Sequence, residues 1–282
     1  MSESTVTPRR RARFAHSSSG ARLSAGRLPY EQPVSKSWAW GQPNATGVRV
    51  CLIDSGVDRL HEELAGAEIT ALAVELDGGG VPRIVADEES DPSGHGTACA
   101  AIIRRMAPGC AITSIRVLTG ALLRGRGELL LHALEWAVEH GYKLVNLSLS
   151  TTDPGRKERL RDILDRAFTQ GTTVVAAAHN GPFVSYPWRL PTTISVGAHG
   201  VPDPEHLEAN PAPPVDFFAH GVEVLSTRVG GGSCRMSGNS FAAPHVTGLC
   251  ARVLHRHPEF GTEQLRQTLT ALADNVTKDS KP

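Results

Sequence analysis

A buried helix is predicted to begin within the segment Gly238-Asn239-Ser240-Phe241-Ala242-Ala243-Pro244-His245-Val246-Thr247-Gly248. Pro244 suits the first turn of a helix, because the N–H group that proline lacks has no partner within the helix at that position. We therefore expect a helix over residues 241–256 with Ser240 at its N-terminus. The free N–H groups and the helix dipole at this end favour a nearby negative charge. Ser240 is thus either a nucleophile whose reaction creates an oxyanion or an N-cap serine on a core helix.

The composition restricts the class of protein. The chain has 282 residues, enough for one large domain or two small ones with a substantial core. Lysine plus arginine equals aspartate plus glutamate, 29 each, so no overall charge indicates nucleic acid or an acidic substrate as a partner. No apolar stretch reaches the roughly 18 residues of a membrane span, so we expect no membrane-spanning helix.

The first part of the chain differs in composition from the rest. Residues 1–37 are rich in serine, arginine, glycine and proline, and they lack the apolar run of a signal peptide. We expect residues 1–40 to form an irregular basic arm, either solvated or in contact with a partner or membrane surface. Residues 41–282 are expected to form a single domain.

Cysteine usage bears on the redox compartment. Five cysteines, an odd number, stand at positions 51, 99, 110, 234 and 250 without the close pairs of a metal site. Buried free thiols and a reducing compartment fit this pattern best, and the absence of an export signal then predicts a cytoplasmic location. A Cys99–Cys110 disulfide is the alternative.

Apolar strand patterns alternate with helical ones along most of the chain. Strands are predicted over 48–53, 69–76, 111–118, 144–149, 172–178 and 194–198, and helices over 98–103, 128–140 and 157–170. This alternation predicts an α/β protein with a three-layer, doubly wound, mostly parallel sheet.

Polar side chains stand at the ends of these elements, where sites of α/β proteins gather. Asp54 follows the first strand, His95 lies between two glycines at a helix start, and Asn180 follows the strand over 172–178. Taken singly, Asp54 could cap a turn and His95 could be a hydrogen-bonded structural histidine.

Taken together, these groups form a familiar chemical arrangement. A histidine can take the proton of Ser240 while a carboxylate holds the imidazole in the tautomer that does so. The side-chain N–H of Asn180 could join the backbone N–H of Ser240 in stabilising a tetrahedral oxyanion.

Over residues 45–270 the chain resembles the subtilisin-like serine proteases. Four stretches carry the resemblance, in the family's order: Ile53-Asp54-Ser55-Gly56-Val57-Asp58, Gly94-His95-Gly96-Thr97, Ala176-Ala177-Ala178-His179-Asn180 and Gly238 to Val246. The resemblance implies a serine endopeptidase with Asp54, His95 and Ser240 as its triad and Asn180 as its oxyanion donor.

The resemblance also implies where a peptide substrate would bind in an extended form. The implied substrate-binding residues are Gly125, Arg126, Gly127, Ser148, Leu149, Ser150, Ala177, Ala178 and His179. Arg126 could meet an acidic substrate side chain or be solvated. His179 replaces the family's usual glycine and should narrow or polarise the first specificity pocket. Asn239 replaces the usual threonine before the nucleophile, which leaves the tuning of the site open.

Two absences complete the sequence evidence. The family's calcium-binding insertion is missing between Ile103 and Pro108, so we expect no metal at that place and no cofactor. About 45 residues precede the first strand, too few for the family's inhibitory pro-domain. Together with the missing signal peptide, this predicts an intracellular enzyme that removes a leader from a specific precursor peptide. The alternatives are a peptide ligase or macrocyclase on the same site, and an inactive peptide-binding protein of the same fold.

Overall fold

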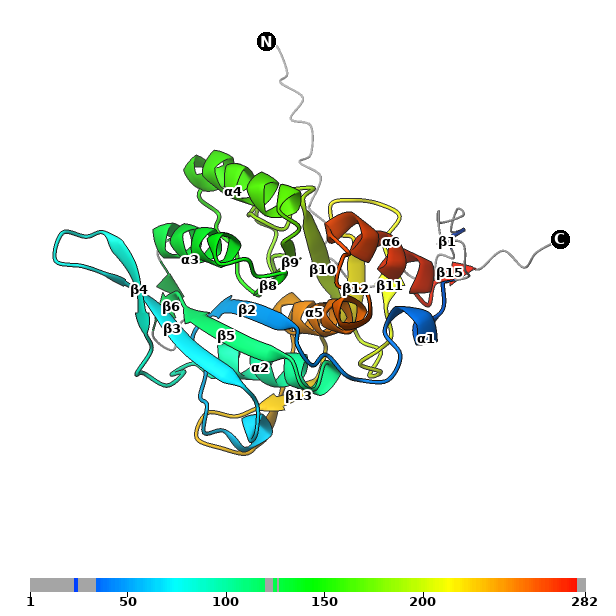
Figure 1. The fold of residues 1–282 in the computed structure, drawn as a ribbon, viewed down its shortest axis with the longest axis horizontal. Helices are drawn as coiled ribbons and strands as arrows, with labels where there is room; N and C mark the ends of the chain where they lie inside the picture. Colours follow the sequence, from blue (N-terminus) through cyan, green and yellow to red (C-terminus); the bar gives the residue numbers. More distant parts are fainter. Residues whose placement is uncertain (1–22, 25–33, 120–123, 126, 278–282) are drawn as a thin grey trace, which may run out of the picture.

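A nine-stranded sheet forms the centre of the protein, and its strand order is β11-β12-β10-β9-β8-β2-β5-β3-β4 (Figure 1). The computed structural model describes residues 23–24, 34–119, 124–125 and 127–277. The strands are β2 (Arg49–Asp54), β3 (Ile69–Leu76), β4 (Pro82–Ala86), β5 (Ala111–Arg116), β8 (Leu144–Leu147), β9 (Thr173–Ala177), β10 (Thr193–His199), β11 (Glu208–Ala209) and β12 (Phe217–His220). All neighbouring pairs are parallel except β3–β4 and β11–β12 at the two edges.

Helices cover both faces of this sheet (Figure 1). On one face lie α2 (His95–Met106) and α5 (Asn239–Arg256), and on the other lie α3 (Gly127–Glu139) and α4 (Lys157–Thr169). Successive side chains of a strand point to opposite faces. Val50 and Leu52 of β2 accordingly join the core under α2 and α5, whereas Cys51 and Ile53 join the core under α3 and α4. The predicted three-layer, mostly parallel α/β fold is confirmed.

Shorter elements connect and flank these layers. They are α1 (Lys36–Ala39), α6 (Thr262–Leu272), the 3₁₀ turns η1 (Glu62–Leu64) and η2 (Pro154–Arg156), and the short strand pairs β1 (Leu23–Ser24) with β15 (Val276–Thr277), β6 (Leu118–Thr119) with β7 (Arg124–Gly125), and β13 (Val224–Thr227) with β14 (Ser233–Met236). Most of the predicted basic arm over residues 1–40, including its arginines, lies outside the described residues. No helix within the described ranges has the length and apolarity needed to cross a membrane.

The start of α5 corrects two expectations. The N-cap position is held by Gly238, so Ser240 lies inside the first turn and the N-cap alternative for it is wrong. Pro244 is the sixth residue of the helix rather than a first-turn residue. A proline there cannot donate to the carbonyl four residues earlier, which is that of Ser240. That carbonyl must therefore find another donor.

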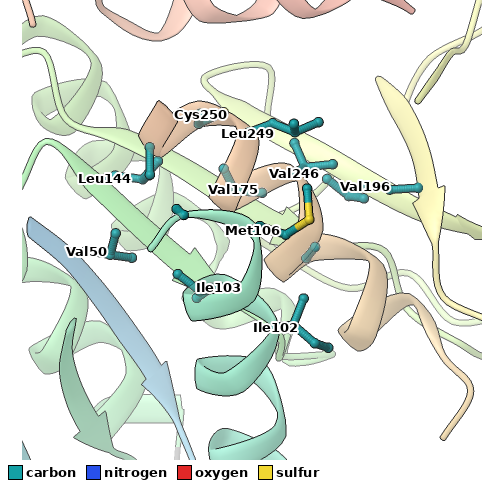
Figure 2. Close-up of a cluster of buried hydrophobic side chains, with 14 of the residues drawn as sticks. Val50, Ile102, Ile103, Met106, Leu144, Val175, Val196, Val246, Leu249 and Cys250 are labelled. Atoms are coloured by element: carbon teal, nitrogen blue, oxygen red, sulfur yellow. The ribbon is translucent and has the colours of Figure 1, made fainter. Parts of the chain in front are cut away.

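All five cysteines are free, and four of them are buried, so the alternative Cys99–Cys110 disulfide does not form. Cys250 belongs to the core between α5 and the sheet, where Ile102, Ile103 and Met106 of α2 also pack (Figure 2). A large cluster without cross-links stabilises this half of the protein by burial of apolar area.

The two helices of this core touch through a glycine. A Cβ atom placed on Gly248 of α5 would lie 2.2 Å from Cβ of Met106 in α2. We therefore predict that Gly248→Ala forces the helices apart and lowers the free energy of unfolding by about 1–3 kcal/mol. Chemical denaturation measures this change. Gly200→Ala is the matched control, because nothing lies within 4 Å of a Cβ there. Equal stability of the two variants would contradict the close contact.

Candidate active site

Asp54 and His95 form a short hydrogen bond where β2 ends and α2 begins. Nδ1 of His95 lies 2.7 Å from Oδ1 of Asp54, and both residues are buried. The backbone N–H of Ser55 donates to the same oxygen at 2.8 Å, which fixes the carboxylate. Because a carboxylate only accepts, Nδ1 carries the proton and Nε2 is left with its lone pair. This is the tautomer that can act as a base.

The environment of His95 favours its protonated form. Burial lowers its pKa, but attraction to Asp54, the hydrogen bond to Asp54 and the charge of Asp91 together raise the pKa above its ordinary value. Phe241 packs its ring against the imidazole with centroids 5.3 Å apart, which restricts the ring's rotation.

Asp91 organises the start of α2 and was missed by the sequence analysis. Its Oδ2 accepts from the backbone N–H and the hydroxyl of Thr97, both at 2.8 Å. Its Oδ1 accepts from the hydroxyls of Ser55 at 2.9 Å and Ser93 at 3.0 Å. This buried carboxylate therefore caps the helix that carries His95. Its signal in the sequence was the run of acidic residues that begins at Asp87, and nothing in that run pointed to His95.

Ser240 shares a pocket with His95. The pocket has a volume of about 240 Å³, and its lining consists of His95, Ser148, Leu149, Ser150, Ala177, Ala178, His179, Asn180 and Ser240. The sequence analysis had assigned all of these residues to the site. The pocket lies at the carboxyl end of the parallel strands, where α/β folds bind ligands.

A backbone contact orients the side chain of Asn180 towards Ser240. Its Oδ1 accepts from the backbone N–H of Asn239 at 2.8 Å, so its Nδ2 points the other way. A Cβ atom on Gly238 would lie 3.3 Å both from Nδ2 of Asn180 and from Oγ of Ser240. The amide donor and the hydroxyl thus lie around Gly238, where a side chain would crowd both groups.

The carbonyl of Ser240, which Pro244 leaves without a helical donor, is satisfied from the neighbouring strand. The hydroxyl of Ser148 donates to it at 2.9 Å, and the thiol of Cys99 lies 3.5 Å from it. Asn146 donates to the Ser148 hydroxyl at 3.0 Å and accepts from Thr247 at 2.7 Å. A buried polar chain therefore joins the start of α5 to the end of β8.

Asn239 turns its side chain away from the pocket. Its Oδ1 accepts from the backbone N–H of Ala198 at 2.9 Å. Its Nδ2 donates to the carbonyl oxygens of Ala178 at 3.1 Å and His179 at 3.4 Å. Asn239, which stands where the family usually has threonine, therefore forms a brace that links β10 and the end of β9 to the start of α5. Both the amide oxygen and the amide nitrogen of Asn239 are hydrogen-bonded within the protein.

Gly125 and Gly127 are not among the described residues that line the pocket. Gly125 ends β7, and Gly127 begins α3. A Cβ atom on Gly127 would lie 2.4 Å from Nε of Arg156, so the glycine gives room to that guanidinium. Arg126 lies outside the described residues. Substrate binding by these three residues stays a prediction.

One group of side chains in the described part of the chain combines metal-ligand types. The ligand atoms of Asp54, His95 and Cys99 lie within 4.8 Å of one another. A metal there would have to replace the Asp54–His95 hydrogen bond, so it would compete with the base rather than assist it.

The raised pKa of His95 predicts a pH dependence for the reaction of Ser240. The base works only when Nε2 is unprotonated, so the reaction rate should fall as the pH drops through a midpoint above 6.5. The rate of labelling by a fluorophosphonate, measured against pH, gives this midpoint. Asp91→Asn removes one of the charges that raise the pKa and should move the midpoint down. A wild-type midpoint below 6.5 would contradict the assignment of His95.

The brace formed by Asn239 predicts a loss of turnover on its removal. Asn239→Ala leaves the buried N–H of Ala198 without a partner and releases the start of α5 from two strands. We expect stability to fall by about 1–3 kcal/mol and kcat to fall roughly tenfold or more.

Asn275→Ala is the matched control for this experiment. The Asn275 amide bridges both backbone groups of Ala209, with two contacts of 2.8 Å, away from the pocket. This variant should lose stability and keep kcat. A similar loss of kcat in both variants would assign the effect to general destabilisation.

Comparisons with known proteins agree with this geometry. A model of the subtilase family matches residues 45–281. Subtilisin of Bacillus pumilus is 31% identical over 267 residues, which cover 87% of this chain and 91% of the relative.

Solved structures share the fold. A cold-adapted subtilisin-like serine proteinase superposes with a TM-score of 0.67 at 22% identity, covering 93% of this chain and 98% of its own. A lanthipeptide protease gives 0.62 at 24%, covering 78% of both chains. The prenylagaramide maturation protease PagA gives 0.60 at 23%, covering 85% of this chain and 94% of its own. The protein therefore belongs to the subtilase family and is a subtilisin-like serine protease.

Proposed function

We propose that the protein is a cytoplasmic serine endopeptidase that removes a leader from a specific precursor peptide through an acyl-enzyme on Ser240. The observation that carries this proposal is the 2.7 Å hydrogen bond between Asp54 and His95 at a pocket that His95 shares with Ser240 and Asn180. In this assignment Asp54 orients His95, His95 is the base, and Ser240 is the nucleophile.

The first half of the reaction forms the acyl-enzyme. Oγ of Ser240 attacks the peptide carbonyl carbon while its proton passes to Nε2 of His95. The negative charge that forms on the carbonyl oxygen is stabilised by Nδ2 of Asn180 and by the free backbone N–H of Ser240 at the start of α5. The intermediate then collapses, and the leaving amine takes the proton from His95.

The second half of the reaction repeats these roles with water. His95 takes a proton from water as its oxygen attacks the acyl carbon, and the same two N–H groups stabilise the second oxyanion. Collapse releases the carboxyl product and returns the proton to Ser240.

Several observations support a narrow substrate range. The imidazole of His179 takes up space in the pocket wall, so fewer kinds of substrate side chain fit into the pocket. Residues 148–150 line the same pocket, and we expect their backbone to pair with an extended peptide. Two of the proteins that share the fold are a lanthipeptide protease and a maturation protease.

The cysteines support the proposed cytoplasmic location. All five are free, which is in keeping with a reducing compartment.

A fluorophosphonate probe tests the nucleophile. We expect it to label the wild-type protein at Ser240 and not the Ser240→Ala variant, with the site located by mass spectrometry. Asn180→Ala should lower peptide turnover by roughly 10²–10³-fold, because one oxyanion donor is lost. Absence of labelling in the folded wild-type protein would overturn the proposal. The product mass from a cleaved peptide then distinguishes water from an amine as the acceptor.

A further inference from the structure

The ring of His179 is fixed in one tautomer. The backbone N–H of Gly181 donates to Nδ1 at 2.7 Å, while the carbonyl oxygen of Gly181 lies farther away, at 3.2 Å. Because Nδ1 accepts this hydrogen bond, the neutral ring carries its proton on Nε2. His179 therefore presents an N–H donor at its far end.

A second contact holds the orientation of this ring. Phe183 meets it edge to face, with ring centroids 5.4 Å apart and planes at 82°. A Cβ atom on Gly181 would lie 3.0 Å from Phe183 and 3.1 Å from His179, so a glycine lets both rings approach the same loop. Two directional contacts thus position the imidazole without any use of Nε2.

Nε2 of His179 has no partner among the described residues, although His179 lines the pocket beside Ser240. Most other polar groups of the lining have a role. The hydroxyl of Ser148 donates to the carbonyl of Ser240, and Oδ1 of Asn180 accepts from Asn239. His95, Ser240 and Nδ2 of Asn180 serve the proposed reaction. Among the described residues of the lining, Ser150 is the one further residue whose hydroxyl has no hydrogen-bond partner in the described part of the chain.

The described part of the pocket lining offers polar and apolar groups to a substrate side chain. The other lining side chains, those of Leu149, Ala177 and Ala178, are apolar, and no carboxylate, lysine or arginine is found among the lining residues that the structure describes. An apolar substrate side chain would cover the N–H of His179 without accepting from it. Burying a donor unpaired costs more than the net gain of an ordinary hydrogen bond, so such a substrate is disfavoured.

We propose that the pocket selects a substrate whose residue at the attacked carbonyl (P1) ends in an acceptor oxygen, a carboxamide or a carboxylate, that accepts from Nε2 of His179. This inference rests on the proposed function, because it assigns the P1 side chain of the acyl-enzyme formed on Ser240. Glutamine, glutamate, asparagine and aspartate have such side chains.

The test uses fluorogenic peptides that differ only at P1. Glutamine and glutamate are compared with methionine, which is similarly long and unbranched but has no acceptor oxygen. We expect kcat/KM to be roughly tenfold or more higher for the better of the two acceptor residues than for methionine. The ratio of glutamine to glutamate identifies the carboxamide or the carboxylate as the preferred group.

His179→Phe keeps an aromatic ring and removes the donor, so it should abolish this preference by raising the relative rate with methionine. His140→Phe is the matched control: His140 lies at the end of α3, where its ring stacks on Trp136, and the preference should be retained. Ser150→Ala should retain the preference as well. Loss of the preference in Ser150→Ala but not in His179→Phe would overturn the assignment to His179.

Labelling by the fluorophosphonate separates this inference from the proposed function. Wild-type protein that is labelled at Ser240 and cleaves the methionine peptide as fast as both acceptor peptides overturns the P1 inference alone. Absence of labelling overturns the proposed function. His179→Phe should still be labelled, which shows that the variant is folded and that its nucleophile is intact.

Discussion

The close approach of α2 to the end of β2 is the constraint on which the site depends. A Cβ atom on Gly96 would lie 2.1 Å from the carbonyl oxygen of Gly56 and 3.3 Å from Cβ of Asp54. No side chain fits between the helix and the strand, and this lack of space brings Asp54 and His95 within a 2.7 Å hydrogen bond. The Asp91 carboxylate then holds the first turn of α2 in place through Thr97, Ser55 and Ser93. The orientation of His95, the predicted base, thus follows from backbone packing.

Ser240, at the start of α5, is held by a hydrogen bond from outside its own helix. Pro244 cannot donate to the carbonyl of Ser240, and Ser148 of the neighbouring strand end donates instead. The same carbonyl would otherwise belong to the regular helical ladder. Ser240, the predicted nucleophile, is thereby tied to residues 148–150, the predicted substrate-binding edge. A shift of that edge would move Ser240 with it.

Much of the fold and several site residues could be predicted from the sequence. Apolar strand patterns alternating with helical ones predicted the layers, because periodicity reports which side of an element is buried. Asp54, His95, Asn180 and Ser240 were assigned to the site because each stands at the end of an element and lies in one of the four stretches that resemble the subtilisin-like proteases.

The sequence analysis failed where contacts between distant residues decide the outcome. The effect of Asn239 on the site was left open, and its amide bonds to Ala198 on β10 and to Ala178 and His179 just after β9. Pro244 was placed in the first turn because local preference cannot show that α5 already begins at Asn239. The tautomer of His179 depends on the direction of one backbone N–H, which no residue pattern reports.

The strand β2 has a consequence for how the molecule loses its structure. Its alternate side chains belong to the two hydrophobic cores on opposite faces of the sheet, and its last residue is Asp54. If either core unfolds, β2 loses the packing contacts on that face. The contacts that β2 makes with the other core are then weakened as well. Separate partial unfolding of the two faces is therefore disfavoured, and the molecule loses its structure as one cooperative unit. Thermal inactivation should accordingly follow global unfolding rather than local loosening around the site.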